Sequence, residues 1–241
     1  MARPIALWAT PRTISTAFDR MMRERGDHHV LTEPFSVAYY DGPEQRSSRY
    51  PVTESDATFD AVLAQVMEVA DRGPVFVKDM AYHLGPKLDA DTLGRFANSF
   101  LIRDPARSLP SMAKIWPTFT TEEAGYQAQR TAFDLVGELT GETPVVIEAT
   151  SLQTDPERVV GAWCERVGIE PRPEALTWEP GMPAGWERWA DWFEGAATST
   201  GFEPLGGDGS PADLDMVDAP GLAEAVVEAR RHYDHLRQYA I

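Results

Sequence analysis

The stretch PIALWATPRTIST, residues 4–16, decides the fold of this chain. Its first half is a short apolar run typical of a buried strand, and its second half gathers hydroxyl side chains around one arginine, Arg12. Residues 15–25 then place apolar side chains at three- and four-residue spacing, which predicts a helix. A strand that turns into a helix in this way exposes unpaired N–H groups and the positive end of the helix dipole. The stretch therefore predicts an anion-binding loop at the start of an α/β fold.

The alternation of strand and helix continues along the chain. Four more apolar runs predict strands: HHVLTEP (28–34), GPVFVKDM (73–80), NSFLIRD (98–104) and TPVVIEAT (143–150). Amphipathic spacing predicts five further helices within the segments 56–72, 89–98, 105–116, 122–139 and 156–168. This order predicts a three-layer α/β domain, residues 1–241, with a central parallel sheet flanked by helices.

The part of the chain after about residue 170 has a different composition, rich in Trp, Pro and Gly. We expect it to be mainly loop and helix, with a flap at residues 201–215 and a final helix from about Pro220. Its tryptophans, Trp186, Trp189 and Trp192, either pack in the core or face a ligand pocket, and core packing is favoured.

Composition limits the classes of function. The 241 residues are 43% hydrophobic, enough for one sizeable core. No run approaches the length of a membrane-spanning helix or resembles a secretory signal, so we expect a cytoplasmic location without membrane binding. The one cysteine, Cys164, predicts a buried thiol and no disulfide within the chain. A formal charge of −16 disfavours nucleic-acid binding and favours a small-molecule ligand over a polyanionic glycan.

Four ionisable side chains are expected at one edge of the sheet. In open parallel sheets, ligands bind beyond the carboxyl ends of the strands. We place Arg12 after the first strand, Glu33 after the second, Lys78 after the third and Arg103 after the fourth. An acidic protein that binds an anion needs such convergent cations.

The loop itself distinguishes between two kinds of anion site. An ATP-binding P-loop reads G-x-x-x-x-G-K-[ST], and aligning Thr16 with its last hydroxyl puts Ser15 where the lysine belongs and Ile14 where the glycine belongs. ATP and magnesium chemistry is therefore disfavoured. The hydroxyls of Thr13, Ser15 and Thr16 with Arg12 still form an anion cradle. A plain helix cap would use the same residue types.

The loop resembles that of sulfotransferases that use 3′-phosphoadenosine 5′-phosphosulfate (PAPS), which reads P-[KR]-[ST]-G-[ST]-[ST]. Ile14 departs from the glycine of that pattern. The family also carries an arginine at a strand end and a serine eight positions later, and both bind the 3′-phosphate of the donor. Arg103 and Ser111 reproduce this spacing, although Arg103 in a surface ion pair is the ordinary alternative. Residues 146–156 resemble a further segment of the family, in which Glu148 has a structural role.

The resemblance, which spans about residues 4–170, implies a P-loop-like sulfotransferase fold and transfer of a sulfuryl group to a hydroxyl or amine. The product would be adenosine 3′,5′-bisphosphate (PAP), and no metal would be needed. Arg12 would stabilise the leaving oxygen, and Lys78 resembles the lysine of the K-[ST]-P-A-Y-F segment in the glycan-modifying branch. Glu33, twenty-one positions after Arg12, resembles the base of the tyrosylprotein and heparan branches. His83 is the rival base, and we favour Glu33.

Two other classes of function remain open at this point. One is a P-loop kinase that uses ATP, and the other is a non-catalytic nucleotide-binding protein on the same scaffold. The sequence leaves the acceptor and the oligomeric state open, with a homodimer among the options.

Overall fold

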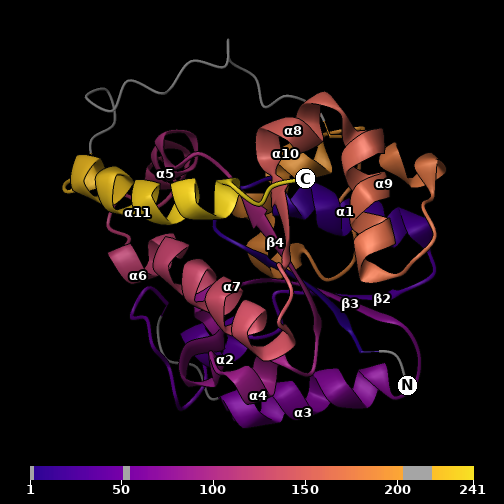
Figure 1. Ribbon diagram of the computed structural model, residues 1–241. Helices are drawn as coiled ribbons and strands as arrows, with labels where there is room; N and C mark the ends of the chain where they lie inside the picture. Colours follow the sequence, from indigo (N-terminus) through magenta and orange to yellow (C-terminus); the bar gives the residue numbers. More distant parts are fainter. Residues whose placement is uncertain (1–2, 51–54, 203–218) are drawn as a thin grey trace.

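The computed structural model describes residues 3–50, 55–202 and 219–241, and its centre is a sheet of five parallel strands (Figure 1). The strand order is β2-β3-β1-β4-β5, so the first strand of the chain lies in the middle. The strands are β1 (Ile5–Ala9), β2 (His29–Thr32), β3 (Val75–Met80), β4 (Ala97–Ile102) and β5 (Val145–Glu148). All five predicted strands and the parallel α/β fold are thus confirmed.

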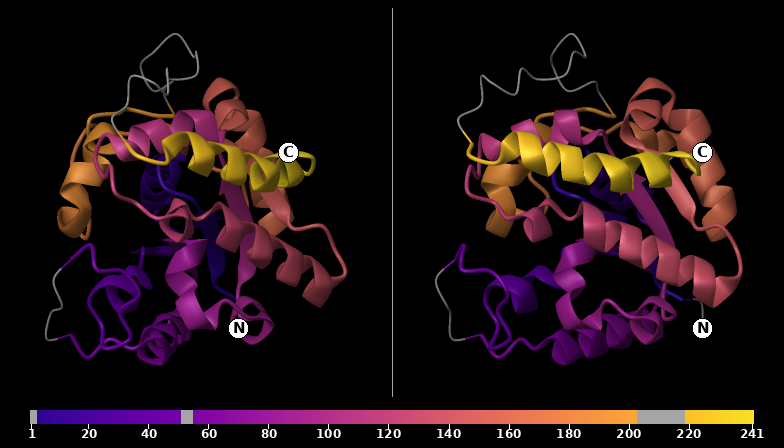
Figure 2. Two further views of the ribbon diagram at one scale, coloured as in Figure 1. Left: turned by 90° about the vertical axis from the view of Figure 1, so that its left-hand side faces the viewer. Right: turned by 60° about the vertical axis from the view of Figure 1, so that its left-hand side comes forward.

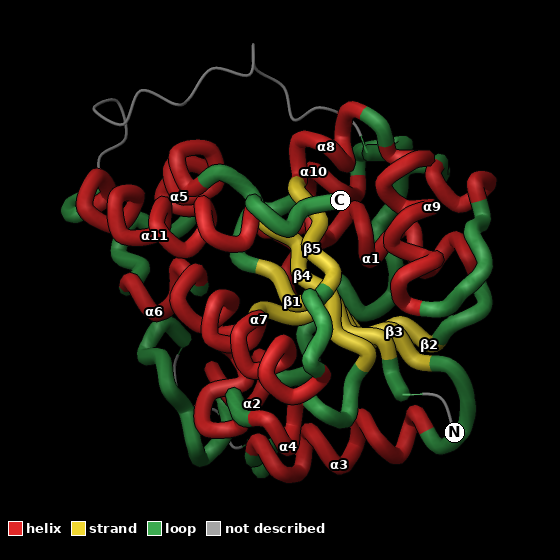
Figure 3. The backbone as a smooth tube through the Cα atoms, viewed as in Figure 1, coloured by secondary structure: helices red, strands yellow, loops and turns green. Residues whose placement is uncertain are grey.

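Helices cover both faces of this sheet, and Figure 3 shows the strands between them. Helices α1 (Ser15–Arg25) and α9 (Pro156–Val167) pack on one face, where Phe18 and Trp163 contact Phe76. Helices α7 (Tyr126–Thr140) and α11 (Leu222–Arg237) pack on the other face, and Figure 2 shows α11 lying across α7 and α5 (Pro105–Ala113). Every residue of β1 and β3 is buried as a result, which explains the continuous apolar run of β1.

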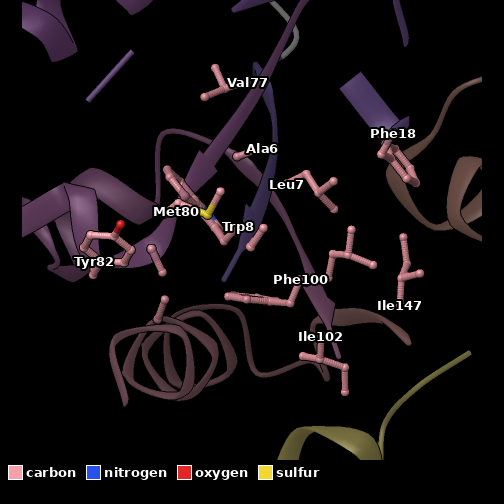
Figure 4. Packing of buried hydrophobic residues seen from close by; sticks show 14 of the residues in the cluster. Ala6, Leu7, Trp8, Phe18, Val77, Met80, Tyr82, Phe100, Ile102 and Ile147 are labelled. Atoms are coloured by element: carbon pink, nitrogen blue, oxygen red, sulfur yellow. The ribbon is translucent and has the colours of Figure 1, made fainter. Parts of the chain in front are cut away.

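The buried side chains form one hydrophobic cluster between sheet and helices. Figure 4 shows Trp8, Phe100 and Phe18 among its members. Trp8 contacts Phe96 edge to face with ring centroids 5.6 Å apart, and its indole N–H donates to Asn98. The last residue also takes part, because the amide of Ile241 donates to the carbonyl of Val146 over a distance of 3.0 Å. The C-terminal end of the chain therefore lies against the edge strand β5.

Two predicted helices differ from the structure. The helix expected within 122–139 is divided into α6 (Thr121–Ala124) and α7, because Gly125 between them has a φ of 82°. A Cβ at Gly125 would lie 2.9 Å from the ring of Tyr82, so the turn also depends on the absence of a side chain. The helix expected within 89–98 shortens to α4 (Ala90–Leu93), since β4 already begins at residue 97.

Several short elements were not predicted individually. They are α2 (Ser36–Tyr40), η1 (Ala81–Lys87), α8 (Ala149–Thr154), η2 (Pro173–Leu176), η3 (Glu187–Trp189) and α10 (Ala190–Ala197), where η marks a 3₁₀ helix. The helix predicted within 56–72 is α3 (Phe59–Ala70). The final predicted helix is confirmed as α11, which begins two residues after Pro220. Most of the predicted flap, residues 203–215, lies outside the described residues. No helix in the described part is both long and apolar enough to cross a bilayer.

Candidate active site

A cavity of about 290 Å³ opens beside the loop that joins β1 to α1. Seven of the predicted site residues line it: Arg12, Thr13, Ile14, Ser15, Thr16, Glu33 and His83. Three others do not, namely Lys78, Arg103 and Ser111, but each bonds to a residue that does. The sheet edge thus brings the predicted residues into one connected group.

The anion-binding loop has an unusual backbone at two side-chain-bearing positions. Arg12 and Ile14 have φ values of 63° and 61°, in the left-handed region that a branched side chain such as that of isoleucine disfavours. The carbonyl of Ile14 accepts from the amides of Ala17 and Phe18 and so begins α1. The left-handed conformation at Ile14 explains why the resembling loop pattern has glycine at this position. In this chain isoleucine adopts the left-handed conformation at this position, and the backbone there is strained.

The half-buried guanidinium of Arg12 and the buried guanidinium of Arg103 meet at this loop. Arg12 donates from Nε to the hydroxyl of Ser111 and from Nη1 to the carbonyl of Trp192, each over 3.0 Å. Arg103, at the end of β4, donates from Nη1 to the carbonyl of Arg12 over 2.8 Å. Burial lowers the pKa of both side chains, although arginine keeps its charge in proteins. Among the described residues neither has an acidic partner within ion-pair distance, so the surface ion pair considered for Arg103 is not observed. Guanidinium groups that are shielded from water and lack an acidic partner, as here, favour binding of an anionic ligand.

Glu33 and Lys78 form a buried ion pair. Lys78 Nζ lies 2.5 Å from Glu33 Oε1, and the backbone of the two residues is joined by a bond from the amide of Glu33 to the carbonyl of Lys78. The placement of Lys78 after the third strand was wrong: β3 continues to Met80, because the last residues of β1 pair with positions 79 and 80. Lys78 is therefore fully buried within the strand, with Nζ 4.8 Å from the ring centroid of Phe193. Lys78 does not line the cavity but contacts Glu33, which does.

His83 is held by a carboxylate that sequence analysis did not single out. Its Nδ1 lies 2.7 Å from Oδ1 of Asp79, which also accepts from the amides of Phe35 and Met80. Burial raises the pKa of Asp79. The Nε2 atom of His83 is buried and has no hydrogen-bond partner among the described residues. When Nδ1 donates to Asp79, Nε2 is left as a hydrogen-bond acceptor, so His83 is also able to take a proton.

Aromatic side chains form the other walls of the cavity. Tyr40 and Tyr50 pack against each other and against Trp189, with ring centroids 5.3 to 5.9 Å apart. Trp192 and Trp189 line the cavity, whereas Trp186 is buried and donates from its indole nitrogen to Asp19. Core packing therefore holds for Trp186, and the other two tryptophans combine burial with a face to the cavity. The walls fit a small apolar or aromatic molecule.

Comparison with known proteins decides the family. The family model of the sulfotransferase domain matches residues 3–229. The chain belongs to the sulfotransferase family. Among curated proteins, this sulfotransferase chain is 29% identical over 216 residues to branched-chain-amino-acid aminotransferase-like protein 2 of Arabidopsis thaliana. The match covers 82% of this chain but 36% of that protein, so the chain spans about a third of the length of this relative.

Solved structures agree with this family at the level of the fold. The sulfotransferase domain from the curacin biosynthetic pathway has a TM-score of 0.55 at 13% identity, covering 97% of this chain and 98% of that one. The sulfotransferase domain from the Synechococcus PCC 7002 olefin synthase has a TM-score of 0.53 at 14% identity, covering 97% and 95%. Mouse sulfotransferase SULT7A1, solved with PAP, has a TM-score of 0.50 at 10% identity, covering 98% and 87%.

Two further residues of this sulfotransferase chain have the structural roles expected of them. Glu148 ends β5 and accepts from the amides of Thr150 and Ser151, so it caps α8. Cys164 is buried in α9, where burial raises the pKa of its thiol. Neither side chain faces the cavity.

Asp79, Arg49 and the tyrosines of the wall were not predicted as site residues from the sequence. Asp79 carried one usable signal, since it stands four residues before His83, but the strand end and the following turn both had to be known to pair them. Arg49 lies in the polar segment 41–55, which the sequence indicates to cross the surface near the site, but without periodicity nothing singles out Arg49 within it.

Proposed function

We propose that this sulfotransferase moves the sulfuryl group of PAPS to a hydroxyl or amine of a small-molecule acceptor. The observation that carries the proposal is the pair of guanidinium groups of Arg12, which is half-buried, and Arg103, which is buried, because neither has an acidic partner in the described part of the chain. They lie beside a loop rich in hydroxyls at the positive end of α1. Such an arrangement suits a ligand with two separate anionic groups, as in PAPS.

The two anionic groups of the donor would occupy neighbouring parts of the site. Residues 12–16 supply backbone N–H groups and hydroxyls for the phosphosulfate, next to the cavity. Arg103 and Ser111 would hold the 3′-phosphate. The existing bond from Arg12 to Ser111 supports this proposal, because it shows that the two parts are within reach of one side chain.

The reaction needs a positioned nucleophile, a proton acceptor and positive charge at the leaving oxygen. The acceptor oxygen or nitrogen forms a bond to sulfur while the bond from sulfur to the bridging phosphate oxygen breaks. The electron pair of that bond remains on PAP, where Arg12 stabilises it. Glu33 takes the proton of the acceptor, and Lys78 holds the carboxylate of Glu33 in place. This assignment keeps Glu33 as base and His83 as its rival.

Binding of PAP in the presence of a chelator tests the proposal. We expect calorimetry to show PAP binding to the purified chain with EDTA present, and much weaker binding of ATP with or without magnesium. The physical reason is that Ser15 and Ile14 stand where an ATP-binding loop needs lysine and glycine.

ADP serves as the matched control ligand, since it lacks the 3′-phosphate. Binding of PAP that required magnesium, or equal affinity for PAP and ADP, would contradict a PAPS-dependent function.

A further inference from the structure

A third cation, Arg49, faces the same cavity and has no role in the chemistry above. Its guanidinium carbon lies 3.9 Å from the ring centroid of Trp116, 4.7 Å from that of Trp192 and 5.1 Å from that of Tyr50. The aromatic rings thus restrict the guanidinium from several directions. Stacking of this kind fixes the plane of the group and removes water from its surface.

The hydrogen-bonding edge of Arg49 is free of protein partners in the described part of the chain. No carboxylate there lies within ion-pair distance, and no hydrogen bond from its guanidinium to a described residue is present. Rings cover the faces of a guanidinium without using its five N–H donors. A planar cation that is stacked but unpaired is suited to bidentate binding of a carboxylate.

The position of Arg49 relates it to the acceptor side of the site. Its neighbour Tyr50 packs on Tyr40, and Tyr40 packs on His83 with ring centroids 5.3 Å apart. A chain of contacting rings thus leads from Arg49 to one of the two proton acceptors. Arg103, which we assign to the 3′-phosphate of the donor, lies outside the cavity lining.

We propose that Arg49 binds a carboxylate on the acceptor, so that the acceptor is an aromatic hydroxy acid. The inference rests on the proposed function, because it assumes that the hydroxyl of this molecule receives the sulfuryl group. The aromatic body lies against Tyr40, Tyr50 and Trp189, the carboxylate meets Arg49, and the hydroxyl points toward Glu33. The three parts of the molecule correspond to three chemically distinct parts of one cavity.

The charge of the whole protein makes Arg49 decisive for such an acceptor. With a formal charge of −16, the chain repels anions at long range, so a carboxylate binds only where a local cation compensates. A neutral analogue of the same shape would leave the stacked guanidinium without a charged partner. The site therefore selects for acid over amide.

Binding of two matched phenols to the chain saturated with PAP tests the inference. The probes are 4-hydroxyphenylacetate and its neutral analogue 4-hydroxyphenylacetamide, measured by calorimetry without any turnover. We expect the carboxylate to bind about tenfold or more tightly than the amide, as for a charge-assisted hydrogen bond in a partly desolvated site.

Two variants separate the carboxylate contact from packing and from total charge. Arg49→Met keeps an apolar side chain between the rings and should abolish the preference for the carboxylate without changing the affinity for PAP. Arg46→Met removes one positive charge from an exposed position three residues away and should leave the preference intact.

The outcomes are distinguishable from failure of the proposed function, which would appear as a lack of PAP binding by the unmodified chain. Equal affinity for the two phenols, absence of binding by both, or a preference that persists in Arg49→Met would overturn the role of Arg49. A tenfold loss of PAP affinity in Arg49→Met would also overturn it, since Arg49 would then serve the donor.

Discussion

Glu33 and His83 offer the cavity two proton acceptors, and each is held by a different kind of partner. Lys78 holds one oxygen of Glu33 in an ion pair, while Asp79 accepts from Nδ1 of His83. The lysine places a positive charge next to the reacting group, whereas the aspartate fixes which ring nitrogen is free. The two residues therefore respond differently to substitution.

We expect Glu33→Gln to lower turnover by roughly 10²–10⁴ with little change in PAP affinity, because glutamine keeps the size of the side chain but cannot take the proton. His83→Asn should cost less. Single-turnover sulfuryl transfer with saturating donor measures the chemical step, and calorimetry on the same variants measures the affinity.

Asp79→Asn is the informative control for this pair, since it alters the partner of His83 and leaves both side chains of the Glu33–Lys78 ion pair in place. Near-normal transfer by Glu33→Gln together with a collapse in both His83→Asn and Asp79→Asn would move the role of base to His83.

At the scale of the element, the loop between β1 and α1 was predicted well in position and less well in conformation. The hydroxyls and the strand-to-helix order indicated an anion site, and the structure confirms that order. The left-handed backbone at Ile14 could not be predicted from the sequence, because the branched side chain of isoleucine disfavours that conformation. The surrounding helix start determines this conformation, through the two amides that bond to the carbonyl of Ile14.

The left-handed backbone at Ile14 predicts that Ile14→Gly is more stable than Ile14→Ala, which reverses the usual order of these two residue types. Ile14→Gly and Ile14→Ala both remove the side chain, but alanine keeps a Cβ that disfavours a φ of 61°. We expect the glycine variant to have a free energy of unfolding about 1 kcal/mol larger than the alanine variant. Denaturant unfolding of both proteins measures the difference.

The exposed glycine at position 73 provides the comparison at an unstrained site, since a Cβ there would meet no atom within 4 Å. Gly73→Ala should be neutral or mildly stabilising. An alanine variant at Ile14 as stable as the glycine variant would show that the left-handed turn costs little.

Some other elements could not be predicted from the periodicity of apolar residues alone. The strands and the long helices were predicted because their apolar spacing is set by burial against one sheet. The division at Gly125 and the short α10 were not, because each depends on a contact with a distant segment. Lys78 in particular is an unusual residue in a buried strand, and its burial is tolerated because its ammonium group forms an ion pair with the carboxylate of Glu33.

At the scale of the whole molecule, the strand order unites two sites that are far apart in the sequence. β4 pairs with β1, so Arg103 at the end of β4 reaches the carbonyl of Arg12 across 91 positions of the chain. The spacing from Arg103 to Ser111 was readable from the sequence, because a strand end and the next helix define it. The cavity walls were not, since they come from several segments that are far apart in the sequence.

This pairing of sites predicts a ligand-dependent effect of Arg103→Ala. Loss of the guanidinium should weaken PAP by about 1.5–3 kcal/mol, as expected for a charge-assisted hydrogen bond. It should weaken adenosine 5′-phosphosulfate far less, since that ligand has no 3′-phosphate. Calorimetry with both ligands gives the two changes.

Arg107→Ala, at a half-exposed position on the same helix as Ser111, is the matched control for loss of charge. Equal losses for both ligands in Arg103→Ala would mean that Arg103 acts through the carbonyl of Arg12 and supports the loop alone.

The central position of β1 also governs how the chain is made. β1 is synthesised before both of the strands that flank it, since Ile5 pairs with Phe76 of β3 and Ala97 of β4, so β1 has no neighbour in the sheet until β3 has been made. During that time its apolar side chains have no sheet to join, and pairing them later requires closing long loops. The nascent chain therefore exposes an apolar segment early and completes the loop between β1 and α1 late.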